Sequence, residues 1–132
     1  MLDLTCKPTA MEILIKTLIA LVAVLHVYFL YLEMFAWTTR GPKVFKTIPA
    51  DQFASTKTMA GNQGLYNGFL AAGLCWSLLI KNPDWQQNVS LFFLACVAIA
   101  GIYGAATVSK RIFFIQAAPA LLAIVLLLLA AG

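Results

Sequence analysis

The sequence predicts an all-α membrane protein, a bundle of four transmembrane helices with both termini on the outer side. Hydrophobic residues make up 62% of the 132 residues and charged residues only 11%, a balance far from that of a soluble globular protein. Four apolar segments are long enough to cross a hydrocarbon layer of about 30 Å. Lipid offers no hydrogen-bond partner to the backbone, and the aliphatic run at 121–129 lacks the alternation of barrel strands, so each segment is expected to be a helix.

We expect these helices at about residues 12–37, 59–80, 89–108 and 112–131, within one integral membrane domain that covers residues 1–132. A long loop at 38–58 joins the first two, and Pro119 is expected to kink the fourth. Small residues recur at a spacing of four, which lets helices approach closely. These stripes, Gly64/Gly68/Ala72 and Ala100/Gly104, would serve packing within one chain or a homo-oligomer.

The distribution of basic residues predicts the orientation. The loops at 38–58 and 109–111 lie on one side and hold six Lys or Arg residues, whereas the other side holds Lys7, Lys16 and Lys81. Positive residues favour the cytoplasmic side of a membrane, so we expect a multi-pass protein of the bacterial inner (plasma) membrane with the long loop in the cytoplasm. The six residues are Arg40, Lys43, Lys46, Lys57, Lys110 and Arg111.

Composition also argues against several function classes. The net charge of +4 arises from residues beside hydrophobic ends, which favours membrane lipids rather than nucleic acid as the partner. Cys6, Cys75 and Cys96 form no CxxC pair, and His26 is the only histidine, so neither a disulfide framework nor a metal site is expected. No phosphate-binding loop is present, and we expect no cofactor.

The candidate site is centred on the first helix. His26 and Glu33 are seven residues apart, so they share a helix face about 10 Å apart along the axis, and we interpret them as candidate catalytic residues. In the predicted orientation, further polar residues fall in the same cytoplasmic half and are expected to bind a ligand: Asn62, Gln63, Tyr66, Asn67, Tyr103 and Gln116. We expect Phe29, Tyr31 and Trp37 to wall this pocket.

Each of these residues also has a simpler interpretation. Glu33 is close enough to Trp37 to reach the headgroups, His26 could serve packing alone, and the amides could only link helices. Three functions therefore stay open. The pocket binds or acts on a small amphiphilic or apolar molecule, with Glu33 in acid–base chemistry; or Glu33 couples transport to protons; or the chain is a structural partner subunit without chemistry.

The segments HVYFLYLEMFAW and MAGNQGLYNGFLAAGL resemble the bacterial membrane family catalogued as domain of unknown function 1304. The resemblance covers the chain from Met11 onward and implies a four-helix inner-membrane protein. The positions that match its motifs are His26, Glu33, Asn62, Gln63, Tyr66 and Asn67. The layout is also similar to that of the membrane-associated proteins of eicosanoid and glutathione metabolism. Gly61 and Gly64 replace that group's Asn and Glu, so no glutathione site is carried over.

Overall fold

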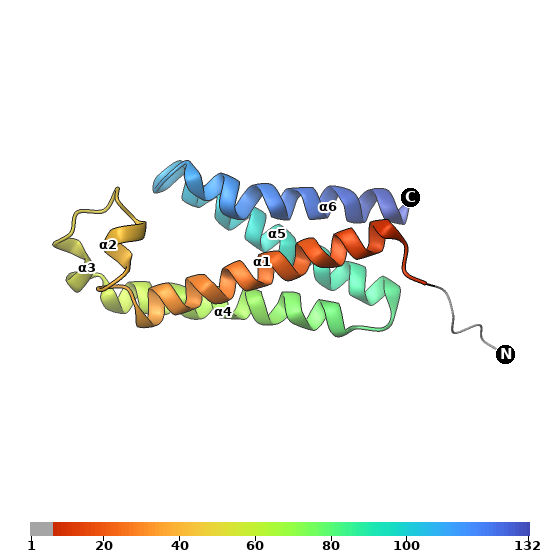
Figure 1. Cartoon of the computed structure of the whole chain (residues 1–132), viewed down its shortest axis with the longest axis horizontal. Helices are drawn as coiled ribbons and strands as arrows, with labels where there is room; N and C mark the ends of the chain where they lie inside the picture. The colour runs from red at the N-terminus through yellow and green to blue at the C-terminus, as the bar shows by residue number, and fades with distance from the viewer. Residues whose placement is uncertain (1–6) are drawn as a thin grey trace.

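The computed structural model describes residues 7–132, and every regular element in that range is helical (Figure 1). The long helices are α1 (Ala10–Phe35), α4 (Lys57–Leu79), α5 (Pro83–Thr107) and α6 (Ala118–Ala131). A π-helical turn, η1 (Phe113–Ala117), precedes α6, and the first loop contains the short helices α2 (Gly41–Val44) and α3 (Gln52–Ser55). The all-α prediction is confirmed for the described residues.

Local capping determines where the helices begin. At the start of α1, Thr9 and Glu12 form a reciprocal capping box, in which each side chain accepts a hydrogen bond from the backbone N–H of the other. At the start of α5, the Asn82 side chain accepts a hydrogen bond from the Trp85 backbone N–H at 3.0 Å, and Pro83 occupies the first turn. The helix expected from residue 89 therefore already begins at Pro83.

An irregular turn occurs where Pro119 was expected to disturb the last helix. Pro119 lacks a backbone N–H, and the turn before it is the π-helical segment η1. At its end the Ala118 N–H donates to the Phe113 carbonyl, five residues earlier. The segment expected at 112–131 is thus divided into η1 and α6.

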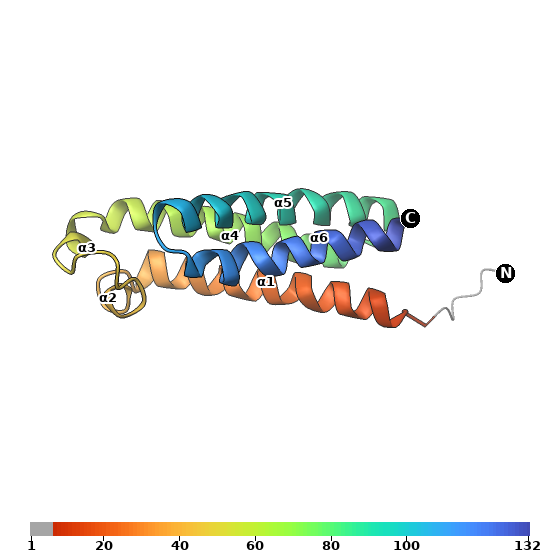
Figure 2. The ribbon, with the colours of Figure 1, turned by 90° about the horizontal axis from the view of Figure 1, so that it is seen from above.

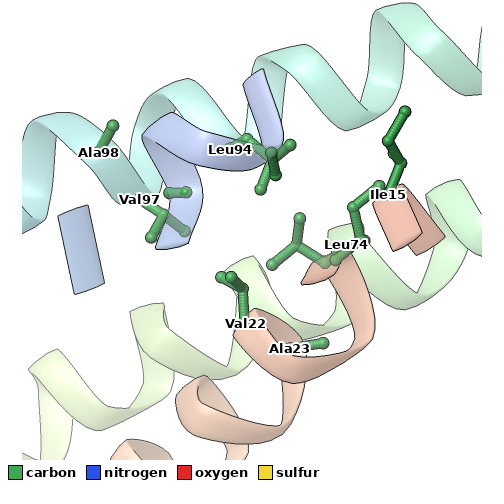
Figure 3. Packing of buried hydrophobic residues seen from close by; sticks show 10 residues of the cluster. Ile15, Val22, Ala23, Leu74, Leu94, Val97 and Ala98 are labelled. Carbon is green, nitrogen blue, oxygen red and sulfur yellow. The ribbon is translucent and has the colours of Figure 1, made fainter. Parts of the chain in front are cut away.

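The four long helices run side by side, as the two views of the ribbon show (Figures 1 and 2). Both α1 and α5 pack against α4 and α6. The first turn of α1 and the last turn of α6 lie at the same end of the molecule, and α2 and α3 lie at the other end (Figure 1). The main core lies between these helices (Figure 3) and consists of Ile15, Ile19, Val22, Ala23, Leu74, Leu94, Val97, Ala98, Ala120 and Ala123.

Three helical segments of the described chain are long and apolar enough to cross a membrane: α1, α5 and Phe113–Ala131. Their outward faces carry many exposed apolar side chains, among them Ile99 and Leu129, each 68% exposed, which a lipid environment explains. The sequence and these helices together indicate a membrane protein. α4 is long enough but is not among the three, because its first half includes Asn62, Gln63 and Asn67.

An aromatic cluster folds the first loop against the end of α1. The Trp37 ring packs on Phe53 and Phe45 at centroid distances of 4.9 and 5.4 Å, and its Nε1–H donates to the Thr56 hydroxyl at 3.0 Å. Gly41 is required here, since a Cβ would lie 2.7 Å from the Phe53 ring. Trp37 therefore anchors the loop, and this differs from the pocket wall expected from the sequence.

Candidate functional site

The Glu33 carboxylate is the centre of the polar contacts between α1 and α4. Its side chain is 5% exposed, although it is ionisable and lies two residues from the end of the helix. Asn67 Nδ2 donates to Oε2 at 2.6 Å, and Gln63 Nε2 donates to Oε1 at 3.2 Å. Gln63 and Asn67 are four residues apart and so share one face of α4. Two neutral amides thus bind both carboxylate oxygens, an arrangement that we call the Glu33 cluster.

Gly64 allows α4 to approach α1 at this point. A Cβ at Gly64 would lie 3.0 Å from the Glu33 Cβ, 3.1 Å from the Met34 N and 3.2 Å from the Leu30 carbonyl oxygen. One turn later, a Cβ at Gly68 would lie 2.9 Å from the Leu30 side chain. Gly64 and Gly68 of the predicted stripe therefore face α1 of the same chain, whereas Ala72 is exposed, and the close approach brings both amides within reach of Glu33.

His26 is fully buried on the same face of α1, two turns before Glu33. Its Nδ1–H donates to the Val22 carbonyl at 2.8 Å, and the ring meets the edge of Phe29 at a centroid distance of 5.6 Å. Nε2 has no hydrogen-bond partner among the described residues. The predicted shared face is present, but no hydrogen bond joins His26 to Glu33 within residues 7–132.

The other residues expected at the site are less enclosed. Asn62 is exposed and borders a groove beside the cluster. Tyr66 and Tyr103 are 60% and 70% exposed, and Gln116 is half-buried in η1. In the described part of the chain, no hydrogen bond connects Tyr66, Tyr103 or Gln116 to Glu33. The structure therefore brings together Glu33, Gln63 and Asn67, with Asn62 at their margin.

Two surface cavities lie at the loop end of the molecule. The larger, of about 370 Å³, is a groove where α1 meets the start of α4, and we call it the α1–α4 groove. Its lining consists of Met34, Thr58, Met59, Gly61, Asn62 and Leu65. The sequence pointed to Asn62 alone among these residues. The other lining residues could also have been found from the sequence. Met34 follows Glu33, Gly61 begins the polar GNQG segment, and the rest flank that segment: Thr58, Met59 and Leu65.

The second cavity, of about 270 Å³, is lined by Tyr28, Arg40, Lys43 and Val44. Two of its four side chains are cationic, and it includes none of the residues expected at the site. Residues 7–132 contain no group of three His, Cys, Asp or Glu side chains that could hold a metal ion. Of the cysteines, Cys75 and Cys96 are free, and Cys6 lies outside the described residues.

Comparison with known proteins gives one family and one curated relative. A sequence profile described as "Protein of unknown function (DUF1304)" matches residues 20–128. The chain is also similar to "Uncharacterized protein YpaA" of Lactococcus lactis subsp. lactis (strain IL1403). The two are 29% identical over 117 residues, which cover 87% of this chain and 97% of the relative. No solved structure matches the chain significantly.

Proposed function

We propose that this protein, which belongs to the DUF1304 family, binds a small amphiphilic molecule in the α1–α4 groove. The observation that carries the proposal is the position of the groove. Met34 follows Glu33 directly and Asn62 precedes Gln63, so the groove adjoins a buried carboxylate whose two oxygens are held by amides. A polar cluster beside an apolar opening is typical of sites that orient a small molecule.

The lining of the groove suits an amphiphile. Its volume of about 370 Å³ falls within the range of small-molecule sites. The thioethers of Met34 and Met59 adapt to apolar groups of varied shape, and Leu65 extends the apolar wall. The Thr58 hydroxyl and the Asn62 amide offer hydrogen bonds to a polar head. The Glu33 cluster holds α1 and α4 in register beneath these residues, so the groove keeps its shape.

We further propose that α1, α4, α5 and the η1–α6 segment all cross the bacterial inner membrane, as one integral membrane domain with both termini outside. Three of them are apolar enough to do so by composition. For α4 the support is its packing, because Gly64 contacts α1 near Leu30 and Leu74 is buried in the main core. Burial against α1 keeps part of the polar start of α4 away from lipid. The six basic residues that set the orientation then lie in the cytoplasm.

A thermal-shift experiment with three probes of equal chain length tests the proposed groove. The purified chain in lipid nanodiscs is titrated with decanol, decanoate and decylamine, which differ only in the charge of the head. We expect at least one probe to raise the unfolding temperature of the wild type, since a ligand that binds only the folded state stabilises it. Met59→Trp, which fills the groove, should abolish that shift.

The matched control is Leu79→Trp, which adds the same ring at a position that is 79% exposed on the same helix. This variant should keep the wild-type response. If none of the probes stabilises the wild type, or if Leu79→Trp loses the shift as fully as Met59→Trp does, the groove is not the binding site. Glu33→Gln then reports whether the cluster shapes the groove: a smaller shift than in the wild type supports that role, and an unchanged shift contradicts it.

A further inference from the structure

We propose that the smaller cavity, lined by Tyr28, Arg40, Lys43 and Val44, binds the phosphate headgroup of an anionic phospholipid. Guanidinium and ammonium groups bind phosphate oxygens through charge-assisted hydrogen bonds, and a phenol adds one neutral donor. A cavity of about 270 Å³ offers these groups together with an apolar edge at Val44. This site shares no residue with the α1–α4 groove and is independent of the proposed function.

Few acidic side chains of the protein itself are available to pair with Arg40 and Lys43 in place of an external anion. Among the acids of the described residues, Glu12 is used in the cap of α1 and Glu33 is bound by two amides. Asp84 follows Pro83 in the first turn of α5, and the start of α5 lies at the opposite end of the molecule from α2 and α3 (Figure 1). Asp51 is therefore the one acid within the loop that carries Arg40 and Lys43. The local excess of positive charge favours an external anion.

The loop that carries these cations is held in a defined conformation. Arg40 donates its backbone N–H to the Ala36 carbonyl at 2.8 Å, and the next residue, Gly41, packs against the Phe53 ring. The Phe45 N–H donates to the Gly41 carbonyl at 2.8 Å, which closes α2 around Lys43. Both cations thus extend from backbone that the aromatic cluster fixes, which lowers the entropic cost of ordering them around a ligand.

The surroundings favour a lipid over a free phosphate. Tyr28 lies two turns before the end of α1 and lines the same cavity as Arg40 and Lys43, and tyrosine is enriched where lipid headgroups meet the hydrocarbon region. Val24 and Leu21 precede it by four and seven residues on the same helix face and are 65% and 49% exposed. An acyl chain can lie along this apolar stripe while its phosphate occupies the cavity. A soluble phosphate would gain nothing from Val24 and Leu21.

Binding of dioctanoyl phosphatidylglycerol to the full chain in detergent tests the proposal, with dioctanoyl phosphatidylcholine as the zwitterionic comparison. The test variant is Arg40→Gln with Lys43→Gln. The matched control, Lys110→Gln with Arg111→Gln, removes the same charge from the other loop predicted on that side. We expect the Kd for phosphatidylglycerol to rise about tenfold in the test variant and less than about twofold in the control. Tyr28→Phe, which keeps the charge, should weaken binding about threefold.

The outcomes separate lipid binding from its alternatives. Equal losses in the test and control variants would overturn the proposal, because the effect would then follow net charge alone. Equal affinity of the wild type for both phospholipids would also overturn it. Inorganic phosphate and glycerol 3-phosphate are added as competitors of the bound phosphatidylglycerol. If they displace it at concentrations close to the lipid Kd, the cavity is a phosphate site without lipid preference, and the lipid proposal is overturned. Circular dichroism should show unchanged helix content, because Arg40 and Lys43 are exposed.

Discussion

At the scale of single residues, the two hydrogen bonds of Glu33 differ in length and in burial. The bond from Asn67 is 2.6 Å long and buried, whereas the bond from Gln63 is 3.2 Å long and its residue is exposed. Water or lipid headgroups can replace an exposed donor, but nothing replaces a buried one. The two amides should therefore contribute unequally to stability, although they bind the same carboxylate.

We expect Asn67→Ala to lower the free energy of unfolding by about 2 kcal/mol and Gln63→Ala by less than about 1 kcal/mol. Unfolding in mixed micelles by sodium dodecyl sulfate, followed by circular dichroism, measures both. Asn62→Ala is the control, because Asn62 is exposed and makes no hydrogen bond to Glu33. Equal costs for the Asn67 and Gln63 variants would show that burial does not decide the contribution of each bond.

His26 presents the opposite case, a buried polar atom without a partner. Its Nδ1–H is used by the Val22 carbonyl, which leaves Nε2 as a bare acceptor among the described residues. An unsatisfied buried acceptor costs about 1–3 kcal/mol. The contacts of His26 therefore do not explain why a polar residue occupies this buried position. The acid–base role predicted for His26 stays a prediction.

At the scale of helices, the contact between α1 and α4 depends on the absence of a side chain at Gly64. We expect Gly64→Ala to destabilise the protein by about 1–3 kcal/mol, because two of the three nearest atoms belong to the α1 backbone and cannot rotate away. The same unfolding measurement applies. Gly61→Ala is the matched control on the same helix: a Cβ there meets nothing within 4 Å, and alanine favours the helix.

A neutral result for Gly64→Ala would mean that α1 and α4 can separate without cost, contrary to the close contact seen here. Loss of stability in Gly61→Ala would point instead to a general sensitivity of this polar turn. The pair thus isolates close packing from helix propensity, because both variants make the same chemical change three residues apart.

The sequence predicted the helices well where hydrophobicity alone determines them, and less well where capping and loop contacts do. The long apolar runs indicated α1 and the last segment closely. The third helix was predicted from residue 89, six residues after its actual start at Pro83, although Asn82 and Pro83 together are a helix-start signal. The contact of Trp37 with Phe53 joins residues far apart in the chain, which no local pattern reveals.

The site was predictable to a similar degree. The burial of Glu33 and its proximity to Gln63 and Asn67 follow from an antiparallel pair of helices with a small residue at the contact. The side-chain lining of the two cavities does not follow from this pairing. The lining depends on how the first loop folds back over α1. It also depends on which methionine, lysine and arginine side chains stay exposed around that loop, and both are features of the tertiary structure.

At the scale of the whole molecule, the open question is whether α4 crosses the membrane. It runs antiparallel to α1, so α3, which ends at Ser55, and the start of α5, which contains Asn88, lie at opposite ends of the helix bundle (Figure 1). If α4 did not cross, both positions would be on the same side of the membrane, and the three apolar helices would leave the chain termini on opposite sides. The polar residues of α4 make this alternative reasonable on hydropathy alone.

Single cysteines in a background without Cys6, Cys75 and Cys96 decide between these topologies. We expect Ser55→Cys and Ser109→Cys to resist a membrane-impermeant maleimide in intact spheroplasts and to react after lysis, whereas Asn88→Cys reacts in both. Four crossings produce this pattern, because the loops at 38–58 and 109–111 then share the cytoplasmic side and residue 88 faces outward. Equal labelling of Ser55→Cys and Asn88→Cys in intact spheroplasts would leave α4 on one side of the membrane. The polar start of α4 would then be solvated by water rather than by its packing against α1.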